Sequence, residues 1–316
     1  MSVAKVPHTE KTRWVRFRRA LIRDRWLYLI MLLPCLYYLL FHYYPMYGVT
    51  LAFKQYKPKL GIIGSPWASQ HGMKYILQVV QDPYFWTVFK NTIVLNVVNL
   101  AITFPAPIIL ALLLNEVTSD RYKRVVQTVT YLPHFLSTVV VVGMMNSMFS
   151  SSGIVNELLG KIGLGPYAFL NDAQYFRPMY IGSNIWQNIG WDSIIFLAAL
   201  SGLDQALYEA ARIDGAGRWK QTIHITIPGI LPTIVIMLIL AMGKIMNVSY
   251  QKILLMMTGS NQSVSDVIST YVYRRGITKA DFSYATAVGL FQSLVSLVFV
   301  TATNWISRRT TETSLW

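Results

Sequence analysis

Long apolar runs separated by short polar segments dominate this chain. Each run approaches the ~20 apolar residues that a helix needs to cross the hydrocarbon core of a bilayer. The runs therefore predict an all-α polytopic membrane protein with six transmembrane helices, at residues 26–47, 85–115, 125–149, 179–202, 229–257 and 284–306. The second run is longer than a bilayer requires, so we expect it to begin as an interfacial helix. Polar groups interrupt the fifth.

Composition agrees with this pattern. Of the 316 residues, 53% are hydrophobic and 13% are charged, whereas a globular domain carries about 25% charged residues. The net charge of +14 is compatible with nucleic-acid binding or with basic loops facing a cytoplasm, and the apolar runs favour the loops. The single cysteine, Cys35, lies within an apolar run and can form neither a disulfide nor a thiolate metal site by itself.

The distribution of Lys and Arg orients the spans. With the N-terminus inside, the inner segments hold sixteen of the 28 basic residues and the outer loops hold nine. This bias predicts that both termini lie in the cytoplasm. We expect a basic N-terminal segment at 1–25 that lies on the anionic inner leaflet, a membrane domain at 26–306 and a cytoplasmic tail at 307–316.

The longest inner loop between spans, 203–228, has its own helical signals. Asp204 is a candidate N-cap, and an apolar helical face is formed by Leu203, Leu207, Ala210 and Ala211. Gly215 and Gly217 can end this helix, and a second short helix can follow through Trp219. Physical reasoning alone leaves two interpretations open, a plain connector and a docking surface.

Several functional motifs are missing from the sequence. No G-x-x-x-x-G-K-[ST] loop is present to bind nucleotide phosphates, and neither H-E-x-x-H nor G-x-S-x-G occurs. We therefore predict no catalytic residues, no metal site and no cofactor in this chain. His42 and His134 are isolated and are interpreted as packing residues. If this membrane protein is a transporter driven by ATP, its ATPase must be another chain.

The segment EAARIDGAGRWKQTIHITIP, at 209–228, resembles the EAA loop of the membrane subunits of bacterial ABC importers. Ile227 is a mild departure, since the family usually has Leu there. NTIVLNVVNLAITFPAPIILALLLNE and YLPHFLSTVVVVGMMNSMF are similar to earlier parts of the carbohydrate-uptake permeases. The first span and its exit resemble the branch that handles polysaccharide fragments and aldouronates. The similarity extends over nearly the whole chain.

The resemblance implies the type I importer permease fold in the bacterial inner membrane. It implies a second permease subunit, two cytoplasmic ATPase subunits that bind ATP and magnesium, an extracytoplasmic solute-binding protein, and an oligosaccharide substrate of the acidic, alginate or uronate type. It also implies that part of the loop couples to the ATPase, at Glu209, Ala210, Ala211, Asp214, Gly215 and Trp219. An ion-coupled secondary transporter is the alternative, and it would show matched polar breaks in two halves.

Polar residues within two spans are candidates for the substrate path, because such groups are costly at membrane depth and usually face a cavity or a partner. Amide, acidic and aromatic side chains suit a saccharide better than an apolar solute. The candidates are Asn184, Gln187, Asn188, Trp191 and Asp192 in the fourth span, and Lys244, Asn247, Tyr250 and Gln251 in the fifth. A second interpretation stays open, in which Asp192 and Lys244 form a structural pair. Lys244 and Lys252 could attract the carboxylates of a uronate.

Overall fold

The computed structural model describes residues 22–310 and 314–315, and most of these form helices. Within the described residues the only sheet-like pairing is an isolated antiparallel bridge between Lys54 and Trp67. The all-α prediction is therefore confirmed. Most of the predicted N-terminal segment, and part of the predicted tail, lie outside the described residues.

Five helical runs of the described chain are long and apolar enough to cross a bilayer: Arg25–Phe53, Pro83–Glu116, Thr138–Lys161, Arg218–Gly243 and Phe282–Thr310. The fourth predicted span is α11 (Ala173–Ser201), which meets the same test only together with α12 (Gln205–Ile213). The two helices meet at a bend of 70°. The amide side chains and the aspartate of α11 lower its hydropathy, so a plain apolar count gives five or six spans.

Two predicted spans are broken helices. The second consists of α6 (Pro83–Thr103) and α7 (Pro105–Glu116), and it is preceded by a separate short helix, α5 (Lys74–Gln81). The third begins as α8 (Asp120–Tyr131), passes through a 3₁₀ turn that contains Pro133, and restarts as α9 (Thr138–Phe149). The prediction of an unbroken helix over 125–149 is wrong because proline has no backbone N–H to continue the hydrogen-bond ladder.

The fifth predicted span also ends earlier than expected. Helix α14 (Ile227–Gly243) stops at its glycine, and the chain continues without regular helix until α15 (Tyr250–Met256). Ser249 caps α15, since its Oγ accepts a hydrogen bond from the Lys252 amide at 3.5 Å. The prediction of a continuous helix over 229–257 is therefore wrong. Residues 244–249 lie outside regular helix, so the predicted polar residues of this span do not share one helical face.

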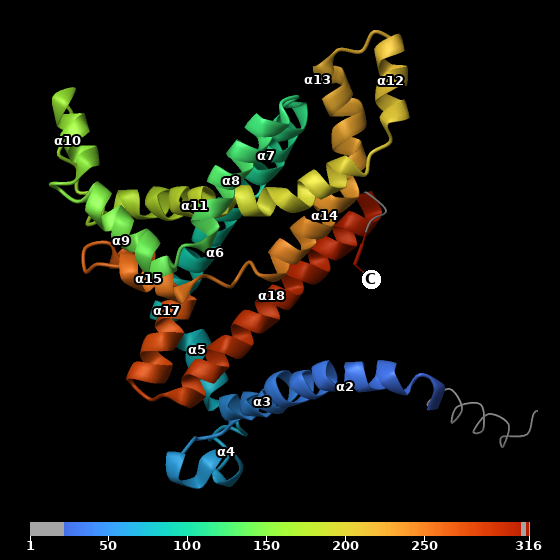
Figure 1. Ribbon diagram of the computed structural model, residues 1–316. Helices are drawn as coiled ribbons and strands as arrows, with labels where there is room; N and C mark the ends of the chain where they lie inside the picture. Colours follow the sequence, from blue (N-terminus) through green and yellow to red (C-terminus); the bar gives the residue numbers. More distant parts are fainter. Residues whose placement is uncertain (1–21, 311–313, 316) are drawn as a thin grey trace, which may run out of the picture.

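Three apolar clusters hold the helices together, and α11 crosses the middle of the molecule (Figure 1). One cluster packs α6 against α17 (Ile268–Val272) and α18 (Phe282–Thr310) around Phe85 and Tyr284. The second joins α9, α11 and α15, and the third joins α7, α11 and α14. Helix α11 contributes to two clusters, and its amide side chains Asn184, Gln187 and Asn188 are half-buried.

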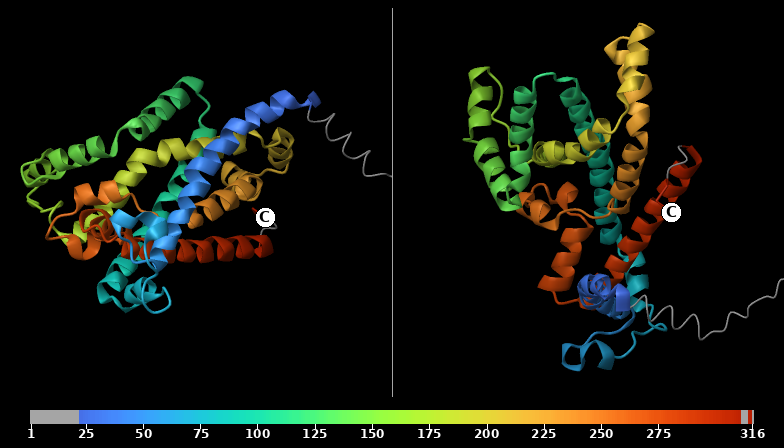
Figure 2. Two further views of the ribbon diagram at one scale, coloured as in Figure 1. Left: turned by 90° about the horizontal axis from the view of Figure 1, so that it is seen from below. Right: turned by 45° about the vertical axis from the view of Figure 1, so that its right-hand side comes forward.

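The first helical run stands apart from these clusters. Helix α2 (Arg25–Tyr38) has no buried residue, and in Figure 1 it runs below α18, apart from the helices above it. The right-hand view of Figure 2 shows it end-on in the lower part of the molecule. Leu33 and Ile30 are 76% and 69% exposed. An apolar helical surface of this kind requires lipid or another protein chain to cover it.

A close crossing of α8 and α11 depends on Gly190. A Cβ atom at this position would lie 2.2 Å from the Thr130 carbonyl oxygen. Gly182, two turns earlier in the same helix, has open space where its Cβ would be. We expect Gly190→Ala to lower the stability of the purified protein by about 1–3 kcal/mol, because the α8 backbone must move.

Gly182→Ala is the matched control for this prediction. It should leave the melting temperature unchanged or raise it slightly, since alanine favours helix over glycine by about 0.5–1 kcal/mol. Thermal unfolding in detergent measures both variants. Equal melting temperatures for the two would show that the crossing tolerates a side chain.

Candidate functional site

Amide side chains form a connected polar face on α11. The Asn184 Nδ2 donates to Asn99 Oδ1 on α6 at 3.0 Å, and Gln187 Nε2 donates to the Leu136 carbonyl at 3.0 Å. Asn188 Nδ2 donates to the Asn184 carbonyl one turn earlier at 3.1 Å. All three predicted amides therefore have partners, and each of them also contacts another segment of the chain.

A lysine lies at the centre of this face. Lys252 on α15 is 3% exposed, and its Nζ donates to Asn184 Oδ1 at 2.6 Å and to Gln187 Oε1 at 3.5 Å. Nζ also lies 5.6 Å from the centre of the Tyr180 ring. The described residues provide no carboxylate within ion-pair distance of this ammonium group. The buried cation is thus surrounded by neutral oxygens and an aromatic ring.

An aromatic surface lies beside the amides. The His134 ring stacks on Trp191 with centroids 4.6 Å apart and planes 1° from parallel, and His134 Nδ1 is 3.0 Å from Asn188 Oδ1. The Phe135 and Trp191 rings form an edge-to-face contact with their centroids 5.4 Å apart. Trp191 is 41% exposed. A flat indole beside an amide provides the stacking surface and hydrogen-bonding groups that a sugar ring can use.

Asp192 and Lys244 line one cavity of about 330 Å³ between the end of α14, α11 and the α6–α7 junction. Both side chains are exposed in the described chain, and no ion pair within 4.0 Å joins them. The other lining residues are mostly apolar, including Phe196 and Met237. The structure thus brings the two predicted charges to one cavity without pairing them directly.

Of the remaining predicted residues, Asn247 lies at a separate, polar cavity, whereas Tyr250 and Gln251 do not line it. Asn247 lines a cavity of about 390 Å³ with Gln292 and Ser293 of α18, and Gln292 Nε2 donates to Asn247 Oδ1 at 3.0 Å. Tyr250 instead stacks on Tyr273 with centroids 5.4 Å apart, and Gln251 is exposed. The break after α14 therefore separates Asn247 from these two side chains.

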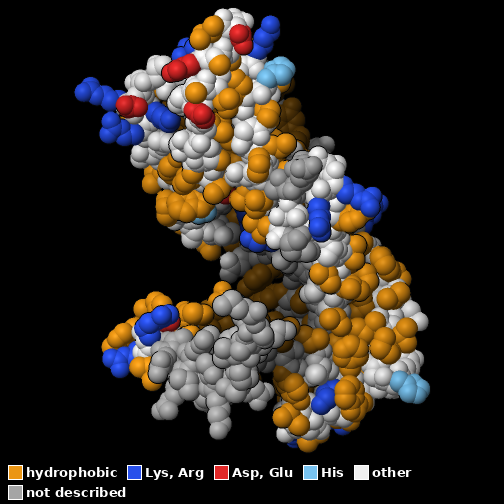
Figure 3. Space-filling view, turned by 90° about the vertical axis from the view of Figure 1, so that its right-hand side faces the viewer, with side chains coloured by type: hydrophobic (Ala, Val, Ile, Leu, Met, Phe, Trp, Pro, Cys, Tyr) orange, Lys and Arg blue, Asp and Glu red, His pale blue; other side chains and the backbone are white. Residues whose placement is uncertain are grey.

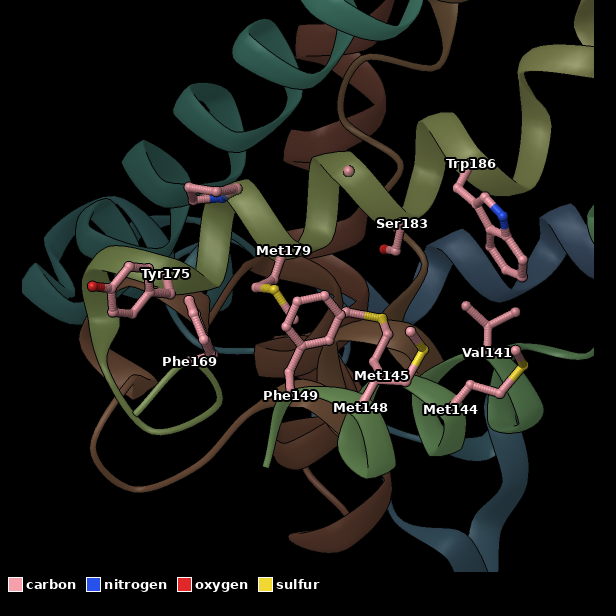
Figure 4. Close-up of a pocket in the computed structure, with 12 residues that line it drawn as sticks. Val141, Met144, Met145, Met148, Phe149, Phe169, Tyr175, Met179, Ser183 and Trp186 are labelled. Atoms are coloured by element: carbon pink, nitrogen blue, oxygen red, sulfur yellow. The ribbon is translucent and has the colours of Figure 1, made fainter. Parts of the chain in front are cut away.

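The opposite side of α11 lines an apolar cavity of about 430 Å³ against α9 (Figure 4). Four methionines contribute to it, with Phe149 and Phe169 at one end and Trp186 at the other. Ser183 is one of the few polar side chains in this lining. Such a surface offers few hydrogen bonds to hydroxyl groups, so the amide side of α11 is the better candidate for contact with a sugar.

Local capping explains the geometry of the 203–228 loop. Asp204 Oδ1 accepts from the Ala206 amide at 2.9 Å, so the predicted N-cap of α12 is confirmed. At the other end Gly215 has φ +74°, and the Ala216 amide donates to the Ala211 carbonyl at 2.8 Å. These features form a Schellman cap, which requires a left-handed residue and therefore favours glycine. The loop is a short rigid helix with a defined turn.

The structure separates the two alanines of the loop motif. Ala210 and Glu209 are exposed, whereas Ala211 is half-buried. Ile213 is 87% exposed and Trp219 is 81% exposed, on either side of the turn that contains Asp214 and Gly215. Figure 3 shows charged side chains gathered at this end of the molecule. An apolar contact surface thus lies among charges.

Three residues that contact the predicted site were not predicted as part of it: Asn99, His134 and Gln292. Lys252 was predicted to attract carboxylates, but not to bond the amides of α11. Asn99 and Gln292 are polar residues inside apolar runs, so the rule that singled out Asn184 also applies to them. His134 was interpreted as a packing residue, and its position on Trp191 depends on the 3₁₀ turn after α8. Within the described part of the chain no group of three His, Cys, Asp or Glu residues could hold a metal ion.

Comparisons with known proteins agree with this arrangement. Residues 103–312 match the family described as "Binding-protein-dependent transport system inner membrane component". The chain is 44% identical to Protein LplB of Bacillus subtilis (strain 168), over 93% of this chain and 92% of the relative. It is 43% identical to the polygalacturonan/rhamnogalacturonan transport system permease protein YteP of the same organism, over 94% and 92% of the two chains.

Two solved structures share the fold. One is a bacterial ABC transporter involved in the import of the acidic polysaccharide alginate, with a TM-score of 0.86 and 42% identity over 94% of this chain and 99% of that one. The other is a bacterial alginate ABC transporter in complex with a periplasmic protein that holds an alginate pentasaccharide. It has a TM-score of 0.86 and 41% identity, over 95% of this chain and 100% of that one. The predicted resemblance is confirmed: this chain belongs to the binding-protein-dependent transport system inner membrane component family, as a multi-pass permease subunit of a sugar-importing ABC transporter.

Proposed function

We propose that this permease imports acidic oligosaccharides of the uronate type, alginate fragments included, by alternating access. In this proposal a solute-binding protein outside the membrane delivers the sugar. A second permease completes the path, and two ATPase subunits at the cytoplasmic end drive the cycle. This chain contributes half of the path and one coupling loop.

The buried cation Lys252 is the observation that carries the acidic substrate. An ammonium group taken out of water without a counter-ion is costly, and buried charges are usually paired. The same chain pairs another buried charge fully: Asp266, 1% exposed, accepts from Arg274 at 2.5 Å and from Thr270 at 2.7 Å. Burial by itself lowers the pKa of Arg274, but the hydrogen bond and the charge of Asp266 raise it overall.

Among the described residues, the polar contacts of the Lys252 ammonium group are with amide oxygens and an aromatic ring, so it is the residue of the polar face best suited to an incoming carboxylate. Two relatives support the same substrate class, because their names specify polygalacturonan and alginate, both polymers of uronic acids. In the proposal the amides and Trp191 bind sugar hydroxyls and ring faces. Lys244, beside Asp192, adds a second positive group nearer the inner end.

The proposed topology has six spans within 26–306, with the N-terminal segment 1–25 and the tail 307–316 in the cytoplasm. Helices α12 and α13 (Arg218–Gln221) and the C-terminal end of α18 lie toward the same side of Figure 1. The bias of Lys and Arg toward these segments supports their cytoplasmic location. Here α11 counts as the fourth span, despite its polar face.

In the proposal the exposed surface of the 203–228 loop contacts the ATPase through Glu209, Ala210 and Trp219, with Ile213 as a further apolar contact. Ala211, Asp214 and Gly215 shape the helix and its turn. An ion-coupled carrier is not favoured, because that mechanism has no use for a capped cytoplasmic helix of this kind, and the family is defined by dependence on a binding protein.

The substrate proposal predicts charge-selective losses. We expect Lys252→Gln to reduce uptake of acidic oligosaccharides about tenfold or more, on the order of one lost charge-assisted hydrogen bond of 1.5–3 kcal/mol. Uptake of a neutral oligosaccharide of equal length should fall much less. Lys244→Gln should also reduce uptake of acidic oligosaccharides more than that of neutral ones, but by a smaller factor, because Lys244 is exposed. Transport by the reconstituted complex into proteoliposomes measures both.

Lys161→Gln serves as the control, since this exposed lysine pairs only with Glu157 on α10 (Ile154–Lys161). It should transport both sugar classes normally. If Lys252→Gln lowered acidic and neutral uptake equally, the lysine would be structural and the charge role would be wrong.

The coupling proposal predicts that surface changes in α12 act on the ATPase. Glu209→Arg and Ala210→Trp should abolish co-purification of the ATPase subunit, or leave ATP hydrolysis that no longer drives transport. Glu157→Arg is the matched charge reversal on α10, and it should retain the ATPase. Normal coupled transport by the two α12 variants would return the loop to a plain connector.

A further inference from the structure

Helix α12 has few attachments to the rest of the protein. None of its residues is buried, although it must transmit force if the proposed coupling is correct. A salt bridge between Arg218 and Glu116 connects the turn region to α7, with a distance of 3.6 Å. Because these side chains are 76% and 46% exposed, this pair contributes little in water. Another contact must hold α12 in place.

Gln221 Nε2 of α13 donates to the Ala216 carbonyl in the turn at 2.7 Å, and α12 itself is joined to the start of the fifth span by a side-chain hydrogen bond. Tyr208 Oη lies 2.9 Å from Thr226 Oγ1. Tyr208 is half-buried, and Thr226 is 3% exposed. A hydrogen bond shielded from water in this way is harder to replace by solvent than the exposed ion pair.

Thr226 occupies a special position in its helix. It is the last residue of a π-helical turn, Thr222–Thr226, which connects α13 to α14. Such turns shift the backbone ladder by one residue and often mark sites where a helix bends. The bond from Tyr208 therefore meets the membrane helix at its joint.

A packing contact supports the same connection. A Cβ atom at Gly229 would lie 2.6 Å from a methyl group of Leu203, so the start of the loop packs directly on the backbone of α14. Positions 226 and 229 are three residues apart and lie on the same side of a helix. The loop is thus fixed to α14 at two adjacent points.

We propose that Tyr208 and Thr226 form the link through which movement of α12 is transmitted to α14. This inference rests on the proposed coupling of the loop to an ATPase. When the ATPase displaces α12, the hydrogen bond and the Leu203 contact carry the start of α14 along, and the cavity lined by Lys244 at the other end of α14 changes shape. Tyr208 is a positioning residue that touches neither nucleotide nor sugar.

Tyr208→Phe tests the link, because it removes one hydroxyl and keeps the ring. We expect the complex to assemble, to keep its melting temperature within a few degrees and to hydrolyse ATP at a near-normal rate. The amount of sugar transported per ATP should fall about fivefold, the factor that one net hydrogen bond is worth. Thr226→Val should give the same loss, and the double variant should be no worse than either single one.

Thr222→Val is the matched control. Thr222 is the first residue of the same π-helical segment, four residues before Thr226. Its hydroxyl donates to the carbonyl of Arg218, which belongs to α13 and not to α12. The sugar-to-ATP ratio of this variant should match that of the wild-type complex.

An equal loss in Thr222→Val, additive losses in the double variant, or an unchanged ratio in Tyr208→Phe would each overturn the link. Failure of the underlying proposal gives a different result: the wild-type chain itself would not co-purify with an ATPase. A Tyr208→Phe complex that loses its ATPase subunit would show that Tyr208 acts in docking, which also contradicts the link.

Discussion

The hydrocarbon core of a bilayer supplies no water, so every polar group at that depth must find a partner within the protein or face a cavity. This constraint explains why the described chain is helical and why its irregular stretches have particular locations. The segment between α14 and α15, which lacks regular helix, lies where Lys244 and Asn247 line cavities. The same constraint gathers the amides of α11 with Asn99 and Lys252 into one hydrogen-bonded cluster. The polar groups that the membrane penalises are thus concentrated in the hydrogen-bonded cluster and the cavities to which the proposed function assigns the sugar.

Local sequence signals predicted those features that depend on local chemistry. Apolar length located the helical runs, and Asp204 and Gly215 fixed the ends of α12 because a cap involves only neighbouring backbone groups. The polar residues of α11 were found because an amide inside an apolar run is costly wherever it points. Motif similarity supplied the family, which the physical signals of the loop left open.

The features that sequence could not predict depend on contacts between distant segments. The helix break after Gly243 is one example, since the polar residues that interrupt 229–257 have a spacing that is also compatible with a continuous helix. Lys252 is another, because its burial depends on Asn184 and Gln187 from a helix more than sixty residues earlier. Ala210 and Ala211 look equivalent in the motif, but the packing of α12 exposes one and half-buries the other.

The position of the 203–228 loop in the chain connects these observations. It joins α11 to α14, so its two ends lead directly into the two helices that flank the cavity shared by Asp192 and Lys244. Asp192 lies nine residues before the end of α11, a distance of ~14 Å along the helix. A rigid α12 attached to α14 by side-chain contacts, and to α11 through a bend of 70°, would move both cavity walls at once. A flexible loop in the same place would absorb the displacement, so in the proposed mechanism the capping residues of α12 matter to transport as much as the proposed sugar-binding residues do.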